Sequence, residues 1–87
     1  MNAYLSKNIT TAATTTVCGT AGVLHSITVN TTAAGTIIYK DGDTVLGTLK
    51  ASVAEQTFLL DICFNNSLVV VTGAASDVTI AYSVAGS

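Results

Sequence analysis

The sequence predicts a small all-β protein, a single antiparallel β-sandwich of about seven strands. Three observations lead to this prediction. Apolar and polar residues alternate over short stretches, turn-forming residues separate those stretches, and β-branched threonine, valine and isoleucine are abundant. No longer window repeats its apolar residues at helical spacing. A chain of 87 residues has room for one hydrophobic core.

The expected elements follow in order from this pattern. Residues 1–12 should form an N-terminal arm, and residues 13–87 should form the sandwich domain. Each expected strand is a short alternating or apolar stretch that lies between turn-forming residues. These strands span residues 14–18, 22–30, 35–40, 44–50, 57–64, 67–72 and 77–84.

The stretch from Lys40 to Thr44 predicts a tight hairpin. Asp41-Gly42 is a pair favoured in type I′ turns, in which both central residues need a positive φ. A two-residue loop of this kind places Lys40 opposite Asp43, where the two charges attract each other across the strands.

A second tight turn is expected at Asn65-Asn66, because asparagine tolerates the left-handed region better than most residues do. The two flanking strands would then form a hairpin with two largely apolar faces. The predicted core face carries Phe58, Leu60, Ile62, Phe64, Val69 and Val71. The opposite face carries Leu59, Asp61, Cys63, Leu68, Val70 and Thr72.

This opposite face needs a cover, and a sandwich of 87 residues has no further layer to place over it. We therefore predict that another subunit packs against it, with Leu59, Leu68 and Val70 as contact residues. The alternative is that the N-terminal arm folds over the same face.

His25, the only histidine, lies within residues 22–30. Strict alternation places it on one face with Val23, Ile27 and Val29, so we expect a hydrogen-bonded structural side chain near the subunit contact. Asp61 stands alone in an apolar stretch, and two roles are open for it. It could accept hydrogen bonds from a loop amide or hydroxyl, or it could fix the register of the subunit contact. The predicted interface comprises Leu59, Asp61, Leu68, Val70 and His25.

Composition argues against several classes of function. Charged residues make up 9% of the chain, against roughly 25% in typical domains. The three lysines do not cluster, so nucleic acid is not an expected partner. The apolar runs are too short to span a membrane, and the N-terminal residues lack the hydrophobic stretch of a secretion signal. We therefore expect no membrane contact and synthesis in a cytoplasm.

No catalytic, cofactor or metal site is predicted, and we do not expect an enzyme. Catalysis would need a nucleophile held by the histidine and a third group that orients it, and no such motif occurs. Cys18, His25, Asp61 and Cys63 are possible metal ligands, but they lack the spacing of structural zinc sites. Both cysteines are expected to be buried free thiols, with a Cys18–Cys63 disulfide as the alternative.

The order of strands and turns resembles a family of very small virion structural proteins from tailed bacteriophages. The resemblance lies in residues 22–30 (GVLHSITVN), the DG turn within residues 40–44, residues 61–72 (DICFNNSLVVVT) and the closing strand at 77–82 (DVTIAY). Together with the intervening residues, it covers the chain from residue 17 to residue 83. This chain has NNSL where the family pattern has a glycine before the leucine.

The resemblance implies a β-sandwich or jelly-roll-like subunit that decorates or cements a phage capsid and is made in the host cytoplasm. The implied partners are the major capsid protein or another virion protein, and further copies of the chain in a homo-oligomer, expected as a trimer. A tail, neck or fibre component is an open alternative. A host-surface or carbohydrate-binding module is another, although the chain has no tryptophan and only three tyrosines.

Overall fold

The computed structural model describes residues 4–85, which contain eight β-strands and no helix. The strands are β1 (Leu5–Ile9), β2 (Thr14–Cys18), β3 (Gly22–Thr31), β4 (Ile37–Asp41), β5 (Thr44–Leu49), β6 (Thr57–Phe64), β7 (Leu68–Thr72) and β8 (Asp77–Val84). The all-β prediction is confirmed, and the additional strand is β1, which lies in the predicted N-terminal arm. Residues 1–3 of that arm and residues 86–87 of the predicted sandwich domain lie outside the described residues.

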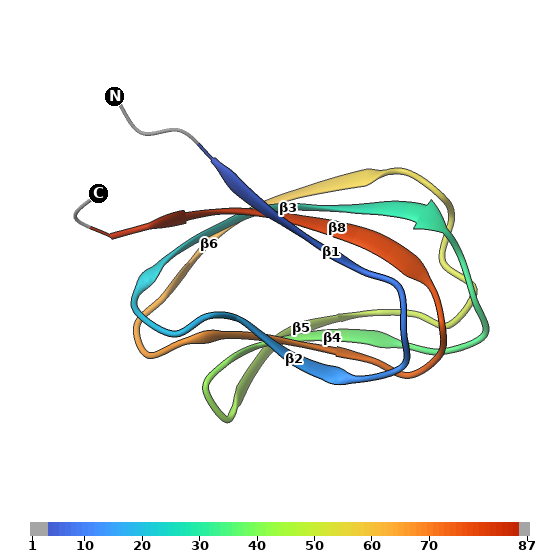
Figure 1. Cartoon of the computed structure of the whole chain (residues 1–87), viewed down its shortest axis with the longest axis horizontal. Helices are drawn as coiled ribbons and strands as arrows, with labels where there is room; N and C mark the ends of the chain where they lie inside the picture. Colours follow the sequence, from blue (N-terminus) through green and yellow to red (C-terminus); the bar gives the residue numbers. More distant parts are fainter. Residues whose placement is uncertain (1–3, 86–87) are drawn as a thin grey trace.

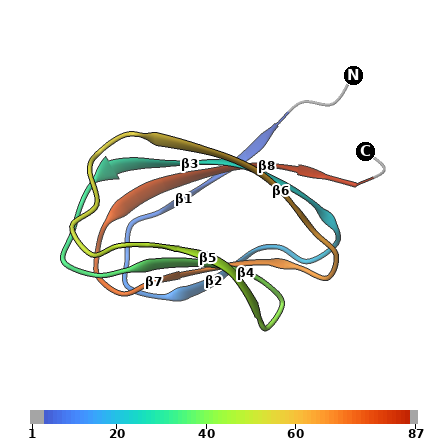
Figure 2. The ribbon, with the colours of Figure 1, turned by 180° about the vertical axis from the view of Figure 1, so that it is seen from behind.

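The strands form two four-stranded antiparallel sheets that pack face to face (Figure 1). Sheet A has the order β1-β8-β3-β6, and sheet B has the order β2-β7-β4-β5. Sheet A is the upper layer and sheet B the lower layer in Figure 1, and the view from behind in Figure 2 shows the same two layers.

The strand pairs follow one rule. β1 pairs with β8, β2 with β7, β3 with β6, and β4 with β5. The chain is therefore a single long hairpin that turns after β4 and is wound so that successive pairs fall alternately in sheet A and sheet B. This winding is the topology of an eight-stranded jelly roll.

The core lies between the sheets, where alternate residues of each strand point inward. Phe58, Leu60 and Ile62 pack against it from β6, as the alternation predicted. The largest fully buried side chains are those of Phe64, Leu24, Ile27, Ile37, Leu68, Ile80, Val70 and Val78.

The prediction of a hairpin formed by β6 and β7 is wrong. β6 lies in sheet A and β7 in sheet B, so residues 65–67 connect the two sheets. β7 pairs with β2 and β4, and its inward residues are Leu68, Val70 and Thr72. Val69 and Val71, which the hairpin register assigned to the core, therefore face outward.

Asp41 holds the connection between β6 and β7 in place. Its carboxylate accepts hydrogen bonds from the backbone amides of Asn65 and Asn66, both at 2.9 Å, and from that of Ser67 at 3.4 Å. Asp41 belongs to sheet B, so these bonds draw the chain away from sheet A as soon as β6 ends. The Asn-Asn pair alone gives no sign of this distant partner.

The β4–β5 hairpin is confirmed, but its register differs from the prediction. Asp41 is the last residue of β4, so the turn residues are Gly42 and Asp43. Gly42 has a positive φ of 60° and Asp43 does not, as in a type II′ turn. Lys40 lies opposite Val45 rather than opposite Asp43.

β1 forms an outer edge of sheet A and pairs with β8. Ile9 is buried, and the other residues of β1 are exposed. This strand of the arm therefore widens sheet A instead of lying over an apolar face, which was the alternative cover considered from the sequence.

Candidate interaction surface on sheet A

Two β-bulges meet on the outer face of sheet A. In β3, the pairing with β8 shifts by one residue between Leu24 and Ser26, so β3 carries an extra residue there. In β6, the pairing with β3 shifts at the same place, because Leu24 pairs with Ile62 while Ser26 pairs with Leu59. A β-bulge changes the direction in which the side chains at that position point. Here the bulges interrupt the alternation of β3 and direct its bulged histidine toward β6.

His25 is that bulged residue, and it pairs with Asp61. The two side chains contact through Nδ1 of the imidazole and Oδ1 of the carboxylate, 2.7 Å apart. An ionised carboxylate only accepts hydrogen bonds, so Nδ1 carries the proton and donates. The side chain of Asp61 is 64% exposed, whereas that of His25 is 27% exposed. The pair therefore lies at the surface, with the imidazole partly covered.

Asp61 has an unusual backbone conformation for a residue within a strand. Its φ is 49°, in the left-handed region that aspartate enters more readily than most residues. This conformation occurs at the β6 bulge, next to the register shift. The hydrogen bond to His25 helps to offset the cost of the conformation.

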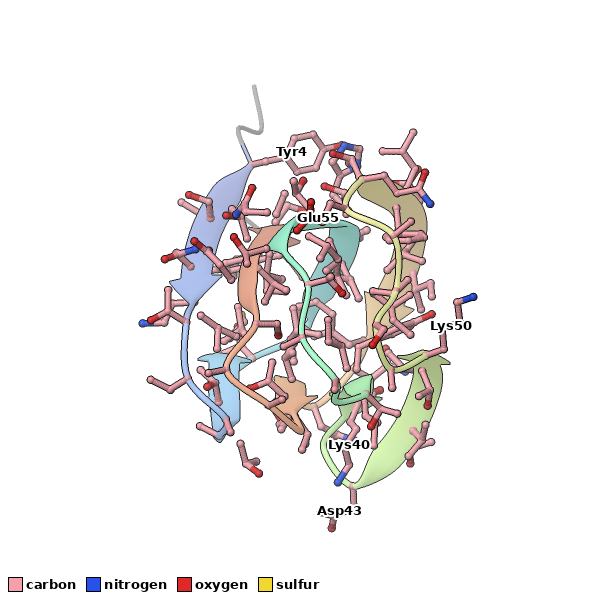
Figure 3. All side chains as sticks on the ribbon, turned by 90° about the vertical axis from the view of Figure 1, so that its right-hand side faces the viewer. Tyr4, Lys40, Asp43, Lys50 and Glu55 are labelled. Carbon is pink, nitrogen blue, oxygen red and sulfur yellow. The ribbon has the colours of Figure 1, made fainter. Side chains whose placement is uncertain are left out.

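Tyr4 covers the imidazole from the far side of β8. Its ring stacks on His25 with 4.0 Å between centroids and 13° between the ring planes. Leu5 pairs with Tyr82, which places Tyr4 opposite Ser83, and the small outward side chains of β8 let the ring pass over that strand. Figure 3 shows the Tyr4 ring extending from β1 across sheet A. Three strands thus contribute to one cluster.

The structure brings together three of the five predicted interface residues. His25 and Asp61 form the pair, and Leu59, two residues before Asp61 on the same face of β6, is 71% exposed. The other two assignments are wrong, because Leu68 and Val70 are both 0% exposed and belong to the core. Their placement depended on the β6–β7 hairpin, which does not form.

The prediction for the neighbours of His25 is correct for Val23, which pairs with the outward Cys63. It is wrong for Ile27 and Val29, which are buried in the core because the bulge shifts their side chains to the opposite face from His25. The sequence analysis did not identify Tyr4 as part of the cluster. Its one available signal was that Tyr4 is the single aromatic residue of the predicted arm.

The remainder of this outer face is polar and internally hydrogen-bonded. Asp77 Oδ1 accepts a hydrogen bond from Asn8 Nδ2 at 2.7 Å and one from Asn30 Nδ2 at 3.2 Å. The hydroxyls of Thr28 and Thr57 lie 3.0 Å apart across β3 and β6. The large apolar groups of the face are therefore concentrated around the His25–Asp61 pair, and we call Tyr4, His25, Leu59 and Asp61 the sheet A cluster.

The two cysteines lie in different environments, and both are free. Cys18 is buried, as predicted, but Cys63 is exposed, because it follows Asp61 on the outward side of β6. Cys63 lines a cavity of about 310 Å³ at one end of the sandwich, together with Gly22, Phe64 and Val84. No charged side chain lines this cavity. Within residues 4–85, no three histidine, cysteine or acidic side chains are placed to hold a metal ion.

Comparisons with protein-family models, with curated proteins and with solved structures find no match to this chain. None of the described residues belongs to a helix that could cross a membrane.

Proposed function

We propose that this protein is a structural subunit of a tailed-bacteriophage particle, a decoration or cement protein that stabilises the shell through protein–protein contacts. The observation that supports it best is the jelly-roll winding of the eight strands, which is the fold implied by the sequence resemblance. Jelly rolls form viral capsid subunits, and they also form lectins and cupins. The winding alone therefore supports several roles, and the residue order over 17–83 favours the virion among them.

The sheet A cluster is the proposed attachment surface. Tyr4 is 57% exposed and Leu59 is 71% exposed, so both present large apolar surface to a partner. Aromatic side chains at the centre of a contact commonly dominate its binding energy. The His25–Asp61 pair between the apolar groups gives the surface polar groups of fixed position, which favour one orientation of the partner.

The expected partner is the major capsid protein or another protein of the virion, and the resemblance implies that three copies associate. The same surface would serve a tail, neck or fibre component. Position in the particle separates these roles, so the test must measure it.

Quantitative mass spectrometry of purified particles provides that test. A copy number comparable to that of the major capsid protein is expected for a shell decoration protein. A small fixed number of copies would instead assign the protein to the tail, neck or fibre. Absence from purified particles would contradict a virion role altogether.

Binding to particles that lack the protein tests the attachment surface itself. Leu59→Asp should abolish binding, because it places a charge among the apolar groups of the cluster. Ala51→Asp is the control, since Ala51 is exposed but lies in the loop after β5, away from sheet A. Equal loss of binding in both variants would show that the attachment surface is not sheet A.

A further inference from the structure

The outer face of sheet B carries two rows of side chains that cross all four strands. In the first row, Thr14 pairs with Val71, Val71 with Ile38, and Ile38 with Thr48. Residues that pair directly point to the same side of a sheet, so these four side chains form a continuous line. All four are β-branched, and none is charged.

The second row lies two residues along β2, β7 and β4, and three residues along β5, where the register shifts. Thr16 pairs with Val69, Val69 with Lys40, and Lys40 with Val45. Val45 is 56% exposed, and Lys40 is the one charged residue of the two rows. We call these two rows the sheet B grid. Three of its four central residues are aliphatic, the fourth is Lys40, and its edges carry three threonines and Val45.

No described segment of the chain covers the sheet B grid. In Figures 1 and 2, the described connections run around the ends of the sandwich, and the tip of the β4–β5 hairpin projects beyond the outer side of sheet B at one end without crossing it. A flat sheet face packs well against a second sheet face of similar character. The grid therefore has the form of one half of a sheet-on-sheet contact.

The charges beside the grid indicate the partner. Within residues 4–85, four of the five acidic side chains accept hydrogen bonds from the subunit itself: Asp41, Glu55, Asp61 and Asp77. Asp43 is the remaining one, at the tip of the β4–β5 hairpin, and neither it nor Lys40 forms an ion pair among the described residues. Figure 3 shows both side chains at that tip, extending away from sheet A.

We propose that the sheet B grid binds a second copy of this chain across a two-fold axis. With the axis running along the strands, the two hairpin tips lie at the same end of the pair. Lys40 of each copy can then approach Asp43 of the other, so the unpaired charges of the two subunits complement each other. A two-fold axis brings the same surface of both copies into contact, and the sheet B grid would be that surface on each copy. This pairing goes beyond the virion role and does not depend on it.

The size of the grid sets the expected affinity. Four strands spaced about 4.8 Å apart and two rows about 7 Å apart give a contact of roughly 270 Å² per copy. A stable complex buries about 800 Å² per partner. We therefore expect weak pairing in solution, with a Kd of about 0.1–1 mM.

Analytical ultracentrifugation of the full chain, at concentrations from about 10 μM to 1 mM, tests the pairing. The wild type should shift from monomer to dimer across this range. Val45→Asp and Lys40→Asp should each raise the Kd by about tenfold, because the first places a charge in the apolar contact and the second places like charges together. The double variant Lys40→Asp/Asp43→Lys should return the Kd to within about threefold of the wild type, since the swap restores complementary charges.

Lys7→Asp is the control, because Lys7 is exposed on β1 of sheet A and the substitution changes the charge as Lys40→Asp does; it should leave the dimer unchanged. Circular dichroism and thermal melting of each variant establish that it is folded. A wild type that stays monomeric throughout the range would overturn the proposal, and so would a Kd that Lys40→Asp does not raise or the double variant does not restore. A trimer in solution that Val45→Asp leaves intact, or loss of association in Lys7→Asp, would place the self-contact elsewhere and overturn the two-fold pairing.

Discussion

His25 and Asp61 are 36 residues apart in the sequence, and their side chains are 2.7 Å apart in the structure. The contact exists because β3 and β6 each carry a bulge at the same position of sheet A. One bulge directs the imidazole outward, and the other gives the aspartate its positive φ. The pair is thus built by irregularities in two neighbouring strands, and Tyr4 stacks on it from a third strand.

Replacing Asp61 should reveal both the cost of its conformation and the value of its hydrogen bond. Asp61→Ala should lower the free energy of unfolding by about 1–2 kcal/mol, because alanine is strained at a φ of 49° and cannot accept the bond from His25. Asp61→Asn should cost less, since asparagine tolerates this region and keeps an acceptor oxygen. Urea denaturation measures both values. Equal stability of the two variants would contradict this account of the bulge.

Tyr4 should hold β1 against sheet A. Tyr4→Ala should lower the free energy of unfolding by about 1 kcal/mol and raise hydrogen exchange in the amides of β1, because the ring contact with His25 is lost. Tyr4→Phe keeps the stacking and should exchange like the wild type. Hydrogen exchange measured residue by residue distinguishes the two variants. Unchanged exchange of β1 in Tyr4→Ala would mean that the pairing with β8 alone holds the strand.

A valine-to-aspartate substitution on the inward face of β7 should unfold the protein, and one on the outward face should leave it folded. Val70 is 0% exposed, so Val70→Asp buries an unpaired charge, at a cost of about 3–5 kcal/mol or more. A small domain has a stability of about 5–15 kcal/mol, so most or all of its stability would be lost. Val69→Asp changes an outward residue and should leave the fold intact. Circular dichroism with thermal melting provides the measurement, and a folded Val70→Asp variant would contradict the assignment of the core.

The alternation within single strands predicted much of the fold. Phe58, Leu60 and Ile62 pack against the core as expected, because β6 keeps its alternation through the bulge. The faces of β7 could not be predicted in this way. Residues 68–71 (LVVV) are all apolar, so the alternation does not show which face of the strand points inward. The pairing of β7 with β2 and β4 decides whether Val69 or Val70 is buried.

The sheet A cluster was predictable only in part. Alternation in β6 placed Leu59 and Asp61 on one face, and that placement is correct. The bulge in β3 depends on its pairing with β8, which local sequence does not encode, so the alternation placed Ile27 and Val29 on the face of His25 although they point into the core. The stacking of Tyr4 depends on the pairing of β1 with β8, which joins the two ends of the chain.

Asp41 should make the free energy of unfolding decrease as the pH falls into the acid range. The backbone amide of Asn65, followed by those of Asn66 and Ser67, donates hydrogen bonds to the carboxylate, and these bonds lower the pKa of Asp41 from its ordinary value of 3.8. Because the pKa is lower in the folded state, the unfolded chain binds the proton more readily. The stabilisation is therefore present above the ordinary pKa, and it is lost as the pH falls through the lower value of the folded state.

Asp41→Asn tests this dependence. The variant should be less stable than the wild type at neutral pH, because an uncharged amide oxygen accepts the bonds of the β6–β7 connection less strongly than a carboxylate. Below pH 3.8, the difference in unfolding free energy between the two proteins should shrink, since the wild type loses its charge. Asp43→Asn removes a charge of the same sign at the same hairpin without losing any hydrogen bond seen in the structure, and it controls for the change in net charge. Urea denaturation of the three proteins from neutral to acid pH measures these differences. If the gap between wild type and Asp41→Asn were constant with pH, the carboxylate charge would not be what holds the connection between β6 and β7.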